Sequence, residues 1–332
     1  MNSLKVSVIG AGSWGTATAN VLAEAGQDVC VWGRDKATVE SINKDRSNPK
    51  YLKGVRLSSA LKASTDLETC LTRADWIVSA IPTQQIRSVF KPHQKLMDGK
   101  SVVNTAKGLE LNTHMRVSEI FAELSPSSSY FILSGPSFAK EVANRLPTAV
   151  TVAGLDEQGA EKIQQMFSTA YFRAYRTTDV VGVELCGALK NVIAIAAGMV
   201  SGLKLGYNAQ AAIINRGMAE VARLGRHLGA DPMTCLGLAG MGDLVLTCTG
   251  PLSRNRSLGV LLAEGKRLEE AQRELGGVAE GLYTADSINA FAEKSKVEMP
   301  ISTQIYNILY KGSTPQRALE ELMKRELKQE WD

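Results

Sequence analysis

The stretch "LKVSVIGAGSWGTATANVLAEAGQDVCVWG", residues 4–33, determines the fold class of this 332-residue chain. It begins with an apolar strand pattern at 4–9 and passes through a glycine-rich turn into a run with apolar residues at helical spacing. Gly26 ends the expected helix, because glycine is common just beyond a helix C-terminus. A second strand pattern follows at 28–33. This order predicts the first unit of a parallel α/β sheet.

The turn contains the pattern Gly-x-Gly-x-x-Gly, in which each glycine has its own physical role. Gly10 permits the tight turn, Gly12 lets the backbone approach a pyrophosphate, and Gly15 allows close packing of helix on strand. The helix N-terminus then offers free N–H groups and a positive dipole end to phosphates. A glycine turn without a ligand is the alternative, but the strand and helix around the turn favour a dinucleotide site. Trp14 is interpreted either as packing onto the core or as a wall against the cofactor.

The end of the second strand bears on the choice of cofactor. An acidic residue at this position typically binds the ribose hydroxyls of NAD. Here Gly33 leaves room, and Arg34 supplies a cation where the 2′-phosphate of NADP would lie. Asp35 is also at about the right distance from the glycines. We therefore expect NADP as the preferred cofactor, with NAD as the alternative.

The rest of the chain divides into two parts. Further strand patterns, with helical stretches between several of them, occur at 75–82, 101–108, 129–135, 148–154 and 171–179. Beyond residue 182 the strand patterns vanish, and helical runs are expected at roughly 182–204, 208–229, 257–275, 278–295, 301–311 and 315–330. We predict an α/β protein with an N-terminal Rossmann-type parallel sheet domain, residues 1–180, followed by an all-α C-terminal domain, residues 181–332, that carries substrate and catalytic groups.

Composition and charge exclude several classes of function. The net charge of +4 is small and scattered, so no nucleic-acid surface is expected. The chain opens directly on a strand pattern without a signal peptide. Its longest apolar run, "VIAIAAGMV", is better explained by a protein core than by membrane insertion. Five cysteines without a C-x-x-C pair, and three histidines without ligand spacing, predict reduced thiols in the cytoplasm and no metal site.

One expected helix contains a lysine in an apolar setting. The stretch "ELCGALKNVIAIAAGMV", residues 184–200, is apolar on nearly every side and is typical of a buried helix. Lys190 lies within it, and Glu184, six residues back, projects from a different face and cannot pair with it. Snorkelling of the lysine to solvent is one interpretation. The other is a functional role in a ligand site, and the rest of the chain must decide between the two.

Two further segments suggest polar ligands. Lys107 closes the strand pattern at 101–108 and therefore faces the crevice where ligands bind in open α/β sheets. The glycine-rich segment 237–259 is expected to lie between helices, and it contains "SRNRS" before a helical run. Helix N–H groups, hydroxyls and a guanidinium together make an anion site. The alternative is a helix cap by Ser253 or Ser257 with exposed arginines.

Five stretches together carry a resemblance to a known family: "GAGSWGTA", "NTAKGLE", "GPSFAKEVA", "ELCGALKNVIAIAAGM" and "GMGDLVLTCTGPLSRNRSLG". In order and over nearly the whole chain, they resemble the NAD(P)-dependent sn-glycerol-3-phosphate dehydrogenases of the bacterial type. The resemblance implies hydride transfer between sn-glycerol 3-phosphate and dihydroxyacetone phosphate, in support of phospholipid synthesis. It also implies a Rossmann domain, a helical C-terminal domain and a homodimer.

The resemblance assigns a role to each matching residue. Lys190 corresponds to the catalytic acid/base, a role that requires its pKa to be lowered toward neutrality by burial and by a second cation, Lys107 or Arg254. The expected cofactor contacts are Gly10, Gly12, Ser13, Trp14, Gly15, Arg34, Lys107, Ala139, Arg254, Val278 and Glu280. The expected substrate contacts are Lys107, Gly135, Ser137, Lys190, Asp243, Thr247, Ser253, Arg254 and Asn255.

Two other functions are compatible with parts of this pattern. One is a related Rossmann reductase of a hydroxy acid or sugar acid, and the other is a nucleotide-binding regulator without catalysis. A carboxylate substrate needs cations, whereas the helix start at "SRNR" suits a phosphate dianion better. A regulator has no need for a lysine inside an apolar helix beside an anion site.

Overall fold

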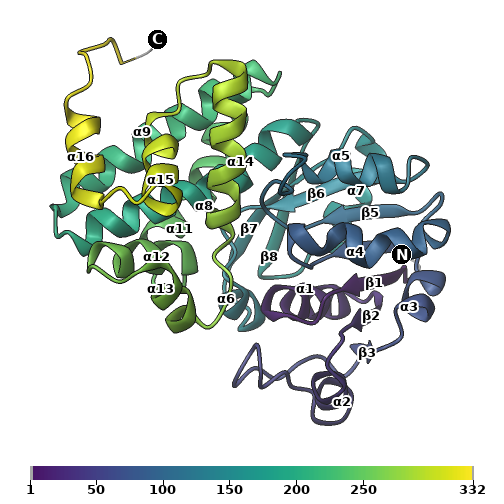
Figure 1. The fold of residues 1–332 in the computed structure, drawn as a ribbon. Helices are drawn as coiled ribbons and strands as arrows, with labels where there is room; N and C mark the ends of the chain where they lie inside the picture. The colour runs from purple at the N-terminus through teal and green to yellow at the C-terminus, as the bar shows by residue number, and fades with distance from the viewer. Residues whose placement is uncertain (1–2, 331–332) are drawn as a thin grey trace.

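The computed structural model describes residues 3–330, and its first part is built on one eight-stranded sheet (Figure 1). The strand order is β3-β2-β1-β4-β5-β6-β7-β8, so the order reverses between β1 and β4. In such a sheet the crevice beyond the carboxyl ends of the strands at this reversal is the usual ligand site. The strands are β1 (Lys5–Ile9), β2 (Asp28–Trp32), β3 (Lys62–Ser64), β4 (Trp76–Ser79), β5 (Ser101–Asn104), β6 (Ser129–Ser134), β7 (Thr148–Ala153) and β8 (Phe172–Thr177).

Helices cover both faces of the sheet, and each face has its own hydrophobic core. One core joins Val8 of β1 to side chains such as Leu22 and Ile163, and the other joins Ile9 to side chains such as Phe90 and Phe121. Successive strand residues thus point to opposite cores, which explains why the central strands are apolar throughout. The helices of this part are α1 (Ser13–Glu24), α2 (Lys36–Asp45), α3 (Leu67–Arg73), α4 (Ile86–Phe90), α5 (Val117–Leu124), α6 (Ala139–Ala143) and α7 (Glu157–Met166).

The sheet differs from the expected parallel arrangement at one step. β7 pairs antiparallel with β6, and the pairs around it are parallel. The connection from Ser134 to Thr148 contains only the five-residue helix α6, which is about 7.5 Å long. A chain of this kind does not return along the sheet, so it enters β7 from the edge at which β6 ends. The three-residue edge strand β3 was not predicted because it is too short to show a pattern.

From Val180 to residue 330 the described chain contains helices and no strand, as predicted. The helices are α8 (Val180–Gly202), α9 (Gly206–His227), α10 (Pro232–Leu236), α11 (Asp243–Thr249), α12 (Arg254–Ala263), α13 (Leu268–Leu275), α14 (Glu280–Ser295), α15 (Pro300–Tyr310) and α16 (Pro315–Met323). They form the green and yellow half of the molecule (Figure 1).

Three helix predictions need correction. The run expected at 257–275 is two helices, α12 and α13, because Gly265 adopts a φ of +91° between them. The glycine-rich segment 237–259, read from the sequence as a connection between helices, is largely helical: it contains a π-helical turn at Leu238–Gly242, then α11 and the start of α12. The last helix ends at Met323 and not near residue 330.

Helix α8 is the centre of the helical part. By length and mean hydropathy (1.7) it could cross a membrane, but 89% of its apolar stretch is buried inside this fold. The prediction of a core helix is therefore confirmed. Its glycines bring neighbouring backbones very close: a Cβ on Gly198 would lie 2.0 Å from the carbonyl oxygen of Arg256 in α12. A Cβ on Gly259 of α12 would likewise lie 2.0 Å from the carbonyl oxygen of Ile195.

This contact predicts a large effect of one methyl group. Gly259→Ala should lower the free energy of unfolding by about 1–3 kcal/mol, because α8 and α12 must separate to accept the methyl. Gly225→Ala in α9 is the matched control, since its nearest contact is a side-chain atom of Ala230 at 3.4 Å. That control should be neutral or gain up to ~1 kcal/mol from helix propensity. Denaturant titrations of both variants measure the difference, and equal stabilities would contradict this account of the packing.

Candidate active site

The glycine turn has two crowded positions and one open position. Gly10 has a φ of +123°, and a Cβ there would lie 2.6 Å from the carbonyl oxygen of Ala80. A Cβ on Gly15 would lie 1.8 Å from the carbonyl oxygen of Gly10, so helix α1 is pressed against the turn. A Cβ on Gly12, by contrast, would meet nothing within 4 Å. The turn is thus tightly packed behind Gly12 and open in front of it, as a pyrophosphate requires.

The N-terminus of α1 presents free backbone donors. Gly12 is the N-cap and supplies no side-chain cap, and the first bond within the helix runs from the Thr16 N–H to the Gly12 carbonyl, 2.9 Å. The amides of residues 13–15 are therefore available to an anion. Ser13 uses its hydroxyl to donate to the carbonyl of Tyr51 at 2.9 Å. Trp14 is partly buried and packs against the core, which favours the packing interpretation of this side chain.

The side chain of Asn48, which the sequence did not indicate as a functional residue, stabilises this turn. The side-chain amide of Asn48 donates to the Ala11 carbonyl at 3.1 Å and to the Thr16 hydroxyl at 2.8 Å. Asn48 is fully buried. It lies 37 residues from Ala11, with no pattern that indicates pairing, so only the folded structure identifies it.

The two candidates for ribose recognition have different surroundings. Asp35 caps α2: one carboxylate oxygen accepts from the Ala37 amide at 3.0 Å, and the other accepts from Lys50 at 2.7 Å. The Lys50 ammonium lowers the pKa of Asp35. Arg34 is exposed. The carboxylate of Asp35 is therefore engaged within the protein, whereas the guanidinium of Arg34 is accessible at the crevice end of β2.

The most concentrated charge in the crevice is a carboxylate between two lysines. Asp243, the first residue of α11, accepts from Lys190 of α8 at 2.7 Å through one oxygen. Its other oxygen accepts from Lys107, beyond the end of β5, at 2.5 Å. The Lys190 ammonium also donates to the Thr247 hydroxyl at 2.8 Å, and Thr247 donates to the Asp243 backbone carbonyl at 2.6 Å. The side chains of Lys190 and Asp243 are 9% and 2% exposed, so this is a desolvated cluster.

Burial and charge together move the pKa of Lys190 into the range of physiological pH. Burial disfavours the ammonium and is the main reason why the pKa falls from 10.5 to about 8. The Lys107 ammonium lowers the pKa further, and the Asp243 carboxylate opposes both effects. Lys190 does not reach solvent by snorkelling. Glu184 has separate partners, so the prediction that it cannot pair with Lys190 is confirmed.

A second group of expected site residues lies where α12 and α14 begin. Ser253 is buried and caps α12 by accepting from the Arg256 amide at 3.2 Å, so the capping interpretation holds for this hydroxyl. Asn255 donates to the Asn191 side chain at 2.9 Å and accepts from the Gly281 amide at 2.9 Å. Because Asn191 follows Lys190 directly, the start of α12 is fixed beside the lysine cluster.

The charged members of this second group have no ion pair among residues 3–330. Arg254 is exposed, and a Cβ on Gly277 would lie 2.5 Å from one of its guanidinium nitrogens. Glu280 is the first residue of α14, and burial raises the pKa of its carboxyl, with the Arg254 charge the largest opposing effect. Val278, at the same helix start, is 46% exposed. Arg254 is therefore the accessible cation at this end of the crevice.

The residues after β6 form the opposite wall. Gly135 has a φ of +148°, and a Cβ there would lie 2.9 Å from the Cα of Val150. The Ser137 hydroxyl donates to the Gly135 carbonyl at 2.9 Å. Ala139 begins α6 and packs partly buried beside the core that includes α1. This turn therefore connects the end of β6 to the helix next to the glycine turn.

Two buried hydroxyl groups lie at this edge of the sheet. The hydroxyls of Ser79 in β4 and Ser134 in β6 have no hydrogen-bond partner within the described residues. Buried hydroxyls without partners are rare unless a ligand or water satisfies them. Gly187 of α8 also belongs to this wall, because a Cβ there would lie 3.3 Å from the side chain of Lys107. Gly187 and Asn191, on either side of Lys190 in α8, carry no pattern in the sequence that predicts a role in the site.

The chain as a whole is similar to proteins of known family. Models of the NAD-dependent glycerol-3-phosphate dehydrogenase N-terminus and C-terminus match residues 5–160 and 179–320. The glycerol-3-phosphate dehydrogenase (NAD(P)+) of Carboxydothermus hydrogenoformans is 46% identical, over 99% of both chains. That of Nitratidesulfovibrio vulgaris strain DP4 is 47% identical, over 98% of this chain and 100% of the relative.

A solved structure leads to the same family. The glycerol-3-phosphate dehydrogenase of Coxiella burnetii superimposes with a TM-score of 0.93 at 40% identity, over 97% of this chain and 99% of that one. The agreement covers the sheet, the helical part and the crevice between them. The chain belongs to the NAD-dependent glycerol-3-phosphate dehydrogenase family.

Proposed function

We propose that this chain interconverts sn-glycerol 3-phosphate and dihydroxyacetone phosphate, with NADP as its preferred cofactor and Lys190 as the acid/base. The nicotinamide cofactor supplies or accepts the hydride when it is bound. The observation that carries the proposal is the buried cluster of Lys190, Asp243 and Lys107, which lies between an open glycine turn and a basic helix start. Neither a hydroxy-acid reductase nor a regulator explains this combination together with the family membership.

The role of Lys190 follows from its hydrogen bonds. An ammonium has three donors. Lys190 uses one on Asp243 and one on Thr247, which leaves one for a substrate oxygen. Reduction of the ketone requires a proton on this oxygen, and oxidation of the alcohol requires its removal. A lysine whose pKa is about 8 performs both near neutral pH. Lys107 holds the other oxygen of Asp243 and keeps the carboxylate aligned.

Replacement of Lys190 tests this role. Lys190→Met should reduce kcat for dihydroxyacetone phosphate by about 10²–10⁴-fold and leave NADPH binding unchanged, because the glycine turn is intact. Lys190→Arg should be similarly inactive, because a guanidinium does not release a proton at neutral pH. Lys100→Met is the matched control: this partly buried lysine precedes β5, at the other end of the strand, and donates to backbone carbonyls. Steady-state kinetics and NADPH fluorescence titration measure both effects.

The pH dependence adds a second readout for the same residue. The ammonium is the proton donor in reduction, so kcat in that direction should fall as pH rises through about 8. Oxidation needs the neutral amine, so its kcat should rise over the same range. A Lys190→Met enzyme that turns over at the parental rate with the parental profile would remove Lys190 from the mechanism.

The start of α12 is proposed to bind the substrate phosphate. Arg254 supplies the accessible charge, and the α12 N-terminus adds a positive dipole end. The Ser253 oxygen accepts as a helix cap, which leaves its O–H free to donate, and Asn255 uses one of its two amide hydrogens on Asn191. Ser253 and Asn255 can therefore donate to the phosphate beside Arg254, which supplies the charge. Gly135 and Ser137 face it from the opposite wall in this proposal.

Removal of that charge should affect only phosphorylated substrates. Arg254→Ala should lower kcat/KM for dihydroxyacetone phosphate by about 10–100-fold, since a charged hydrogen bond contributes ~1.5–3 kcal/mol. Unphosphorylated dihydroxyacetone should be a poor substrate for parent and variant alike. Arg317→Ala removes an exposed arginine of α16 and should change nothing. Equal use of both ketones by the parent enzyme would show that the phosphate site is assigned wrongly.

The preference for NADP rests on the two residues after Gly33. The carboxylate of Asp35 is held by the α2 amides and Lys50, so it does not stand free for a ribose hydroxyl. Arg34 is free to meet a 2′-phosphate. We also propose Ala139 at the start of α6, and Val278 and Glu280 at the start of α14, as cofactor contacts.

Cofactor choice can be measured directly. Arg34→Ala should reduce kcat/KM for NADPH by about 10–100-fold, because a charged contact with the 2′-phosphate is lost. The same enzyme with NADH is the internal control and should change by less than about threefold. An equal loss with both cofactors would show that Arg34 packs against the adenosine and does not select the phosphate.

The proposal also covers the location of the protein, its oligomeric state, its domain boundary and its cellular role. The five cysteines, all buried, are free thiols, which supports a cytoplasmic location. A homodimer is proposed from the family resemblance; the exposed apolar side chains Leu205 and Tyr207 near the start of α9 are available to an interface, whereas α8 is buried within the monomer. The domain boundary is placed near residue 180, because β8 ends at Thr177 and α8 begins at Val180. Supply of glycerol 3-phosphate for phospholipid synthesis is the expected cellular role.

A further inference from the structure

Glu184 is the one acidic residue of α8, and it is buried against the first part of the chain. Its side chain is 4% exposed. One oxygen accepts from the Ser118 amide at 2.8 Å and from the Tyr130 hydroxyl at 2.7 Å. The other accepts from the Ser118 hydroxyl at 2.6 Å and from Arg116 at 3.3 Å. Both oxygens thus have two donors each, and all four donors come from the start of α5 or from β6.

The position of Glu184 on α8 relates it to the catalytic cluster. Glu184, Gly187 and Lys190 follow one another at intervals of three residues and so are neighbours around the helix, about 4.5 Å apart along its axis. Glu184 is attached to α5 and β6, Gly187 lies against the side chain of Lys107, and Lys190 binds Asp243. The direction of Lys190 is therefore set by how α8 is rotated and how far it has slid along its axis.

The rest of α8 holds the helix mainly against its helical neighbours. Asn191 and Ser201 hydrogen-bond to Asn255 and Arg256 of α12, and most other contacts of α8 are made by small and apolar side chains. Apolar contacts are not directional, so the rotation of α8 on the sheet needs a hydrogen-bonded group. Lys190 cannot serve as that group, because it must exchange a proton and contact the substrate.

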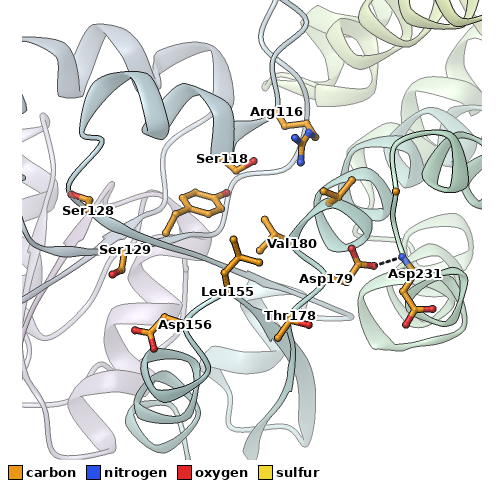
Figure 2. A pocket seen from close by; sticks show the side chains of 13 residues that line it. Arg116, Ser118, Ser128, Ser129, Leu155, Asp156, Thr178, Asp179, Val180 and Asp231 are labelled. Atoms are coloured by element: carbon orange, nitrogen blue, oxygen red, sulfur yellow. Dashed lines mark hydrogen bonds between the residues drawn. The ribbon is translucent and has the colours of Figure 1, made fainter.

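A cleft beside Glu184 increases the importance of its hydrogen bonds. A cavity of about 750 Å³ opens between α5, β6 and the start of α8, and its lining includes Arg116, Ser118, Tyr130 and Val180. Figure 2 shows Arg116 and Ser118 on one side of this cleft and Asp179 and Val180 on the other. The apolar packing of α8 at this point is a small cluster of Val183 with Ile132, Ala153 and Ala239. Asp179, the N-cap of α8, is bonded to the start of α10 by the Asp231 amide and the Thr234 hydroxyl. The Glu184 carboxylate is the hydrogen-bonded contact that joins α8 to α5 and β6.

We propose that Glu184 is a positioning residue for Lys190: its four hydrogen bonds to Arg116, Ser118 and Tyr130 fix the rotation of α8 on the nucleotide-binding part and thereby aim the Lys190 ammonium between Asp243 and the substrate. The proposal rests on the acid/base role of Lys190. It gives Glu184 no contact with substrate or cofactor. Small displacements of a catalytic group cost much activity, so a loosened helix should be visible in the rate.

The test compares two buried glutamates. Glu184→Gln keeps the shape of the side chain but replaces one acceptor oxygen by a donor. Glu220→Gln is the matched control: Glu220 of α9 is 1% exposed and accepts from the amides of Ile301 and Ser302 in α15, away from Lys190. Both variants lose one acceptor in a buried site, so they should lose similar stability in thermal unfolding. Only Glu184→Gln should change catalysis.

We expect Glu184→Gln to lower kcat about tenfold, with the KM for NADPH unchanged, because the reacting groups and not the glycine turn are misaligned. The midpoint of the kcat–pH profile should move by at least about half a unit, since the surroundings of Lys190 set its pKa. Glu220→Gln should keep the parental kcat and profile. Parental kcat and profile in Glu184→Gln, or equal losses in both variants, would overturn the proposal.

Milder variants cover the case in which Glu184→Gln does not fold. Tyr130→Phe and Ser118→Ala each remove a hydroxyl donor and leave the carboxylate in place, and both should shift the pH profile in the same direction as Glu184→Gln. An unchanged profile in both would overturn the proposal. Lys190→Met distinguishes the two proposals. If this variant is active, Lys190 is not the acid/base. If it is inactive while the Glu184, Tyr130 and Ser118 variants behave as the parent, only the positioning role of Glu184 is wrong.

Discussion

The buried carboxylate of Asp243, held between the ammonium groups of Lys107 and Lys190, is the interaction on which the active site depends. It joins three elements that are far apart in sequence: the end of β5, the middle of α8 and the start of α11. Burial raises the pKa of a carboxyl, but the two lysines more than offset this effect and lower the pKa of Asp243 below its ordinary value. The carboxylate therefore stays ionised, and it stabilises the ammonium of Lys190 enough to keep that lysine titratable near pH 8.

The same cluster explains why an anionic substrate suits the site. Lys107, Lys190 and Arg254 bring three cations to the crevice, against the carboxyl groups of Asp243 and Glu280, so positive charge is in excess there. A buried charge without a partner of opposite sign raises the free energy of the folded protein. A phosphorylated substrate and a dinucleotide both bring negative charge into the crevice, so binding relieves a cost that the empty site carries. The charge balance of the protein is thus completed by its ligands.

The features that could be predicted from the sequence are those with local causes. The glycine turn, the strands around it and the apolar helix with Lys190 were visible because spacing and composition reflect backbone geometry directly. Strand β7 was predicted but its direction was not, because the length of the α6 connection sets the direction and a strand pattern does not report it. The helical turns between 238 and 249 were missed because the glycines of this segment suggested a connection, whereas Gly240, Gly250 and Gly259 lie in close contacts with neighbouring atoms.

The partners of the site residues were the least predictable part. Asp243 and Lys190 are 53 residues apart, Glu184 and Ser118 are 66 residues apart, and no periodicity relates either pair. Each pair forms only because α8 runs from the sheet into the helical part and presents a different face to each of them. A helix rich in glycine and alanine can come close to several backbones at once, as Gly198 does with α12. That closeness fixes how near α8 lies to its helical neighbours, and the few polar groups along it, Glu184, Lys190 and Asn191, add the hydrogen bonds that join it to the sheet and to the site.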